Sequence, residues 1–169
     1  MIPAVILVVF PFAMAYAAFS DLVSMTIANR VSVVLVLAFT AVALAIGMPL
    51  ADIAQHFGVA AICLVVTFGC FALGWMGGGD AKLIAATALW FGPTTALVEY
   101  FLWGSVFGGI LTLGLLAVRG TMAPVTGVDF FDHLLQSDTG IPYGIGLGAA
   151  GLFVYSSSDW VALAVRGVV

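Results

Sequence analysis

Runs of apolar residues, separated by short polar stretches, make up most of this 169-residue chain. A helix needs about 20 mainly apolar residues to cross the hydrocarbon core of a bilayer, and all but one of the runs approach or exceed that length. The runs lie at Met1–Phe19, Val31–Leu50, Phe57–Met76, Ala81–Phe91, Thr94–Val118 and from Ile141 into the C-terminus. This pattern predicts an all-α membrane protein, a bundle of about six transmembrane helices that forms a single domain over residues 1–169.

The fourth run is the exception, because Ala81–Phe91 holds only eleven residues before Gly92-Pro93. As a helix it would be about 16 Å long, whereas the hydrocarbon core of a bilayer is about 30 Å thick. It can cross only if it starts below the membrane surface or if the bilayer thins around it. Whether this run crosses the bilayer decides on which side of the membrane the next loop lies.

Polar segments between the runs predict the loops. Ser20–Arg30 follows the first run, and Gly77–Asp80 separates the third run from the fourth. A short polar turn around Asp52 and His56 is expected between the second and third runs. The first two of these loops each carry an aspartate next to an apolar run.

The composition excludes several classes of protein. Of the residues, 64% are hydrophobic and 7% are charged, whereas a soluble domain has about 25% charged residues. A soluble globular enzyme is therefore excluded, and no nucleic-acid partner is expected, because phosphate neutralisation needs clustered Lys and Arg. Cys63 and Cys70 form no Cys-x-x-Cys pair, so we expect no metal site and no cofactor.

The few basic residues predict the orientation. With six crossings, Arg30, Lys82 and Arg119 fall on one side of the membrane and Arg166 falls on the other. The side with more Lys and Arg is normally cytoplasmic. The sequence therefore predicts that the first three residues face the cytoplasm. If the short fourth run did not cross, Arg119 would change sides and this asymmetry would weaken.

The same arrangement places Asp21 and Asp80 at one membrane surface, the predicted cytoplasmic one. Two carboxylates that lie close together cannot both ionise easily, so one of them holds a proton near neutral pH. The ionised member of such a pair can activate a water molecule, and the protonated member can protonate a carbonyl oxygen. This is the chemistry of an aspartic peptidase, and it needs no metal.

The residues around Asp80 fit a peptide substrate. Gly77, Gly78 and Gly79 have no Cβ atoms, so an extended peptide could lie close to the Asp80 carboxyl group. Lys82 could act on a neighbouring carboxylate or hold the backbone of the substrate. An equally simple role for Lys82 is that of an anchor whose amino group extends to the membrane surface.

Other interpretations of the acidic residues stay open. Asp80 could cap the start of a short helix, and Asp21 could be a loop residue at the membrane surface. A different class of function is a non-enzymatic membrane subunit or a proton-coupled carrier that uses Asp80 and Glu99. A carrier needs its carboxylates along a path through the bilayer, whereas a peptidase needs two of them at one face.

Three stretches of the sequence form a set of motifs: Phe19-Ser20-Asp21-Leu22 with Ile27-Ala28-Asn29 after it, Gly77-Gly78-Gly79-Asp80-Ala81-Lys82-Leu83, and Ile141-Pro142-Tyr143-Gly144. These stretches resemble motifs of the type IV prepilin peptidases. Their order and spacing in this short chain are similar to the small peptidases of Flp (tight-adherence) pilus systems. Ala28 departs from the family, which usually has proline at that position.

The resemblance implies that Asp21 and Asp80 are catalytic at the cytoplasmic face of the bacterial inner membrane. It implies a prepilin substrate, cut between a short basic leader and a hydrophobic helix, and the pilus assembly machinery as a partner. Larger relatives also methylate the new N-terminus and carry an insert with paired Cys-x-x-Cys zinc ligands. This chain has no such insert, so leader cleavage without methyl transfer is expected.

Overall fold

The computed structural model describes residues 1–121, 132, 134–136 and 139–167. Within these residues it contains seven α-helices and no strand, as the sequence predicts. The helices are α1 (Ile2–Ser24), α2 (Asn29–Ala45), α3 (Leu50–Ala72), α4 (Gly78–Phe91), α5 (Thr95–Thr121), α7 (Tyr143–Tyr155) and α8 (Asp159–Val165).

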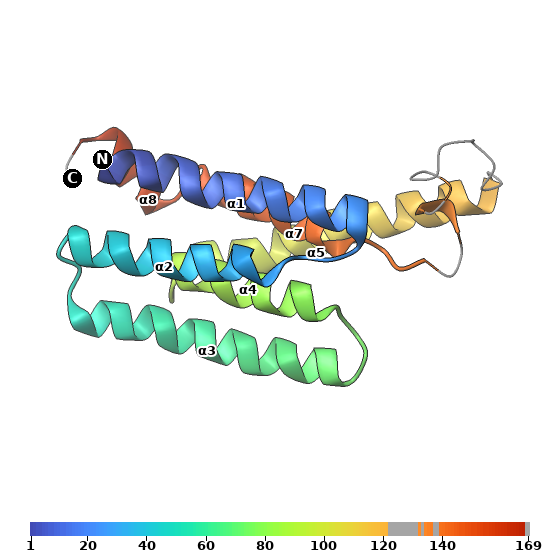
Figure 1. The fold of residues 1–169 in the computed structure, drawn as a ribbon, viewed down its shortest axis with the longest axis horizontal. Coiled ribbons are helices and arrows are strands. Elements are labelled where there is room, and N and C mark those ends of the chain that lie inside the picture. Colours follow the sequence, from blue (N-terminus) through green and yellow to red (C-terminus); the bar gives the residue numbers. More distant parts are fainter. Residues whose placement is uncertain (122–131, 133, 137–138, 168–169) are drawn as a thin grey trace.

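The helices run up and down along the long axis of the molecule (Figure 1). At one end α1 and α3 finish and α2, α4 and α7 begin; we call this the glycine end, because Gly77–Gly79 lie there. The N-terminus, α8 and the starts of α3 and α5 lie at the opposite end. This alternation places Arg30, Lys82 and Arg119 toward the glycine end and Arg166 at the opposite end, as the six-run pattern predicts.

Three helices are long and apolar enough to cross a membrane by themselves. These are α1, α3 and α5, with 23, 23 and 27 residues, while α2 has 17 residues and α7 has 13. Together the long and the shorter apolar helices fit a membrane-embedded bundle. Six crossings remain a prediction.

Helix α4 is the central element of the bundle. From Asp80 to Phe91, Lys82 is the one exposed residue, and the helix packs against α2, α3, α5 and α7. A helix that is apolar on all sides belongs in a protein interior. Because other helices surround it, α4 does not have to match the thickness of the bilayer. It has 14 residues, or about 21 Å of helix, and it begins three residues earlier than the fourth run.

Aromatic side chains join the helices near the opposite end. The indole nitrogen of Trp90 donates to the carbonyl of Leu35 at 3.0 Å, and that of Trp160 donates to the carbonyl of Trp90 at 2.6 Å. The hydroxyl of Tyr155 donates to the carbonyl of Ile6 at 3.0 Å. These bonds link α1, α2, α4, α7 and α8, and they give the polar groups of Trp90, Tyr155 and Trp160 hydrogen-bond partners within an apolar surrounding.

The first predicted loop begins later than the sequence indicates. Helix α1 continues through Asp21 to its last residue, Ser24, and the residue after it, Met25, has a left-handed φ of 52°. The hydroxyl of Ser24 donates to the carbonyl of Ser20 at 2.7 Å, so this polar side chain is satisfied within the last helical turn. The polar character of Ser20–Arg30 is therefore compatible with one more turn of helix, and Asp21 is helical.

The predicted turn around Asp52 and His56 is wrong, because both residues lie in α3. Pro49 is the residue before the first helical turn, a place where its missing N–H costs nothing. Asp52 lies in that turn, where a carboxylate is favourable. The ring nitrogen Nδ1 of His56 is 2.7 Å from the carbonyl of Leu89 in α4. A contact between α3 and α4 thus explains why a polar histidine lies within this apolar helix. The polarity of the sequence does not reveal such a contact.

Candidate active site

Asp21 is held by the start of a helix that lies far away in the sequence. Its side chain is 6% exposed, and its Oδ2 atom accepts a hydrogen bond of 2.7 Å from the backbone N–H of Gly144, 123 residues away. Gly144 is the second residue of α7, where backbone N–H groups have no partner within the helix and carry partial positive charge. The start of α7 therefore orients the Asp21 carboxylate.

This contact requires glycine at position 144, because the space there is too small for a side chain. A Cβ atom there would lie 2.8 Å from the Cβ and the Oδ2 of Asp21, and 2.8 Å from the Cδ1 of Ile27. These separations are shorter than the usual contact of about 3.5–4.0 Å between carbon atoms. The absence of a side chain at Gly144 thus allows α7 to approach α1 and its connection to α2.

Asp80 is the third residue of α4 and is 8% exposed. The residue before the helix is Gly77, so the interpretation of Asp80 as the capping residue is wrong. Its Oδ2 atom lies beside Gly77, 2.9 Å from the place where a Cβ of that residue would be. Its Oδ1 atom is buried and has no hydrogen-bond partner among the described residues. One oxygen of Asp80 therefore lies against the start of the helix, and the other has no partner in the described part of the chain.

The three glycines before Asp80 let the start of α4 fit closely against its neighbours. Gly78 and Gly79 are already helical, and Gly77 is extended. A Cβ at Gly79 would lie 3.0 Å from the Cβ of Ile27, and one at Gly78 would lie 3.2 Å from the ring of Phe71. Close packing around Asp80 is thus one use of these glycines, beside the approach of substrate that the sequence predicts.

Asp21 and Asp80 line a single cavity of about 300 Å³ at the glycine end, which we call the carboxyl cavity. The two carboxyl groups are close enough to interact electrostatically. The structure therefore brings all six predicted site residues together around one space. The residues that line it are Asp21, Met25, Thr26, Ile27, Asn29, Gly77, Gly78, Gly79, Asp80 and Lys82.

Lys82 stands at the rim of the carboxyl cavity. Its Nζ donates a hydrogen bond of 2.8 Å to the side-chain oxygen of Asn29 at the start of α2. This bond connects α4 to α2 beside the two aspartates. Its partner is thus an amide and not a carboxylate.

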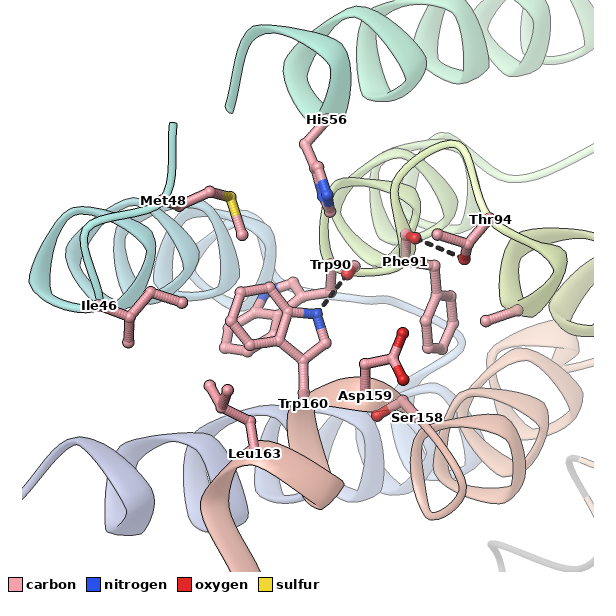
Figure 2. A pocket seen from close by; sticks show the side chains of 11 residues that line it. Ile46, Met48, His56, Trp90, Phe91, Thr94, Ser158, Asp159, Trp160 and Leu163 are labelled. Atoms are coloured by element: carbon pink, nitrogen blue, oxygen red, sulfur yellow. Dashed lines mark hydrogen bonds between the residues drawn. The ribbon is translucent and has the colours of Figure 1, made fainter. Parts of the chain in front are cut away.

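The remaining candidate residues lie at the opposite end. Glu99 is exposed in the first turns of α5. A second cavity, of about 230 Å³, lies there among α3, α4, α8 and the segment after α2, and Figure 2 shows His56, Asp159 and Trp160 around it. Asp80 therefore shares a cavity with Asp21 and lies at the other end of the bundle from Glu99.

Gly144 belongs to the third motif stretch, Ile141–Gly144, but the sequence alone predicts no role for it. A signal was present, since Gly144, Gly146 and Gly148 alternate through the first turns of α7. Small residues in a membrane helix allow neighbouring backbones to approach closely. A Cβ at Gly146 would lie 2.8 Å from the backbone nitrogen of Gly108, and one at Gly148 would lie 2.8 Å from the carbonyl oxygen of Met14. The glycines therefore mark the face of α7 that packs on α5 and α1.

Comparison with known proteins gives a separate line of evidence. Residues 8–113 match the model of the type IV leader peptidase family. The matched range contains Asp21 and Gly77–Lys82 and ends before Gly144. No curated protein and no solved structure matches the chain.

Proposed function

Because the chain belongs to the type IV leader peptidase family, we propose that it is an aspartic endopeptidase that removes short basic leaders from prepilin-like substrates. The observation that carries the proposal is that Asp21 and Asp80 line one cavity at the end of a membrane bundle. The excess of basic residues at this end favours the cytoplasmic face of the bacterial inner membrane. The order and spacing of the three motif stretches favour the Flp pilus type of peptidase, with a pilus assembly system as its partner.

The surroundings of the two carboxyl groups suggest how they divide the reaction. The Gly144 N–H stabilises negative charge on Asp21, so Asp21 removes a proton from water as the water oxygen attacks the scissile carbonyl carbon. Asp80 carries the shared proton and gives it to the carbonyl oxygen. When the C–N bond breaks, Asp21 returns its proton to the leaving nitrogen, and Asp80 recovers a proton from the hydroxyl group of the intermediate.

Gly77–Gly79 and Lys82 support the substrate in this proposal. Gly77 is exposed and extended beside Asp80, so a substrate strand can lie against it. The Lys82 amino group lies at the rim of the carboxyl cavity, where it can donate to a backbone carbonyl of the substrate.

Co-expression with candidate prepilins tests the proposed function. A substrate with a basic leader should show a leader-sized mobility shift, and sequencing of the product should place the cut between the leader and the apolar helix. The new N-terminus should have the mass of an unmethylated amine, because we propose cleavage alone. If no basic-leader substrate is cut while the protein is present in the membrane, the proposal is wrong.

Cleavage is expected to survive strong chelators. Two carboxyl groups supply both the acid and the base of the reaction, and among the residues the structure describes no three His, Cys, Asp or Glu side chains gather as metal ligands. The measurement is the cleavage rate in detergent before and after incubation with EDTA. A loss of activity that zinc restores would contradict the mechanism.

A further inference from the structure

An apolar groove runs between α2 and α3, with α4 as its floor. Its volume is about 300 Å³, and we call it the α2–α3 groove. The two outer helices lie beside each other in Figure 1 and are joined at the opposite end. Its lining includes Ser32 and Val36 of α2, Ala61 and Leu64 of α3, and Ala85, Ala86 and Leu89 of α4.

The groove exists because α3 packs on α4 and makes few contacts with α2. Thr67 is the one buried residue of α3. The remaining apolar side chains of that helix are exposed or half-buried, including the part that faces the groove. The bundle therefore leaves space beside α4 for another apolar element.

The α2–α3 groove joins the carboxyl cavity at Lys82, which lines both spaces. Along α4, Asp80 lies in the carboxyl cavity, and Ala85, Ala86 and Leu89 lie in the groove. The groove thus extends from Lys82 to Leu89, about 10 Å along the helix. A chain that lay in the groove and continued past Lys82 would reach the two carboxyl groups.

We propose that the α2–α3 groove binds the first turns of the apolar helix that follows the scissile bond of the substrate. This inference rests on the proposed function. With the helix in the groove, the peptide bond before it falls in the carboxyl cavity, and the basic leader extends beyond the glycine end. The alanines on the floor and on α3 have small side chains, so the backbone of a guest helix can approach α4 closely.

A second apolar groove, between α1 and α2, shows why the α2–α3 groove is the better site. It is larger, about 470 Å³, and is lined by residues such as Val8, Phe12 and Val34. It shares no lining residue with the carboxyl cavity. Its polar end is formed by Arg30, which bonds to the Tyr16 hydroxyl. Because it shares no lining residue with the carboxyl cavity, this groove is less suited to bring a peptide bond to the aspartates, and it supplies a matched control.

Kinetics with two substrates test the proposal. Ala61 is exposed on α3 and lines the α2–α3 groove, so Ala61→Phe fills the groove with little strain in the bundle. We expect KM for a full-length prepilin to rise roughly tenfold to hundredfold, the equivalent of overpacking a fitted apolar contact. A peptide with the leader and the cleavage site but no apolar helix should be cut at the wild-type rate. Val34→Phe, in the control groove, should change neither rate.

Other results overturn either the proposal for the α2–α3 groove or the proposed function. Equal effects of Ala61→Phe and Val34→Phe, or no effect of Ala61→Phe, would show that the groove does not bind the substrate helix. If the wild-type protein cuts neither substrate, the proposed function itself fails. If Ala61→Phe loses both activities, photo-crosslinking decides the matter.

For that measurement, a photoreactive residue replaces Ala61 or Val34 in the full chain that also carries Asp80→Asn. Capture of the prepilin helix from position 61 and not from position 34 supports the proposal. Capture of lipid alone, of a second copy of this chain, or of nothing from position 61 overturns it.

Discussion

Asparagine in place of Asp21 or of Asp80 is expected to reduce leader cleavage by about 10²–10⁴-fold, because each change removes the acid or the base from the reaction. The variants should still insert into the membrane and fold. The amide oxygen of an asparagine at position 21 can still accept the hydrogen bond from Gly144. The measurement is the cleavage rate of a co-reconstituted prepilin, beside the amount of protein in the membrane.

Two further aspartates provide matched controls. Asp52 lies in the first turn of α3 and Asp159 in the first turn of α8, both exposed and both at the end opposite the carboxyl cavity. Asp52→Asn and Asp159→Asn should leave cleavage close to wild type. A double variant of Asp21 and Asp80 should be no slower than either single variant, since residues that act as a unit are not additive. Full activity in either single variant would contradict the proposed pair.

The sequence predicts the fold class because lipid imposes a strong constraint on the chain. Runs of about 20 apolar residues leave helices as the structure that satisfies their backbone groups. The number of runs is enough to predict that Asp21 and Asp80 lie at the same end, because each crossing reverses the direction of the chain. The structure agrees, since α1 finishes and α4 begins at the glycine end.

The short fourth run could not be interpreted in the same way. Its length raises the question of whether it crosses, but hydropathy does not reveal that four other helices pack around it. In the structure Ala81–Phe91 is buried apart from Lys82, and the thickness of the bilayer no longer limits its length. Packing between distant segments, which a single sequence does not show, decides the role of this helix.

The same limit applies to the surroundings of the aspartates. Polarity placed Asp21 in a loop, whereas the N–H of a residue 123 positions away holds it in the last turn of a helix. The resemblance to prepilin peptidases marked the stretch around Gly144, and only the fold shows that this stretch meets α1. The residue types of the site could be predicted, but the atoms that orient them could not.

Alanine in place of Gly144 is expected to lower kcat about a hundredfold while changing KM little. The added Cβ would lie 2.8 Å from Asp21 and from Ile27, so the Asp21 side chain has to move. A misplacement of about 1 Å in a reacting group can cost about 10²-fold in rate. None of Gly144, Asp21 and Ile27 lines the α2–α3 groove, where the substrate helix is proposed to bind, which is why KM should stay near its wild-type value.

Gly140→Ala is the matched control, because a Cβ at Gly140, four residues earlier, would meet nothing within 4 Å. Both substitutions add one methyl group near the start of α7, so a general effect on the chain before that helix would appear in both variants. A positioning role predicts instead that kcat falls only in Gly144→Ala, with the protein still folded in the membrane. Wild-type kcat in that variant would show that the contact between Gly144 and Asp21 does not set the geometry of the reaction. A rise in KM with unchanged kcat would mean that the start of α7 contributes to substrate binding and not to the position of the Asp21 carboxylate.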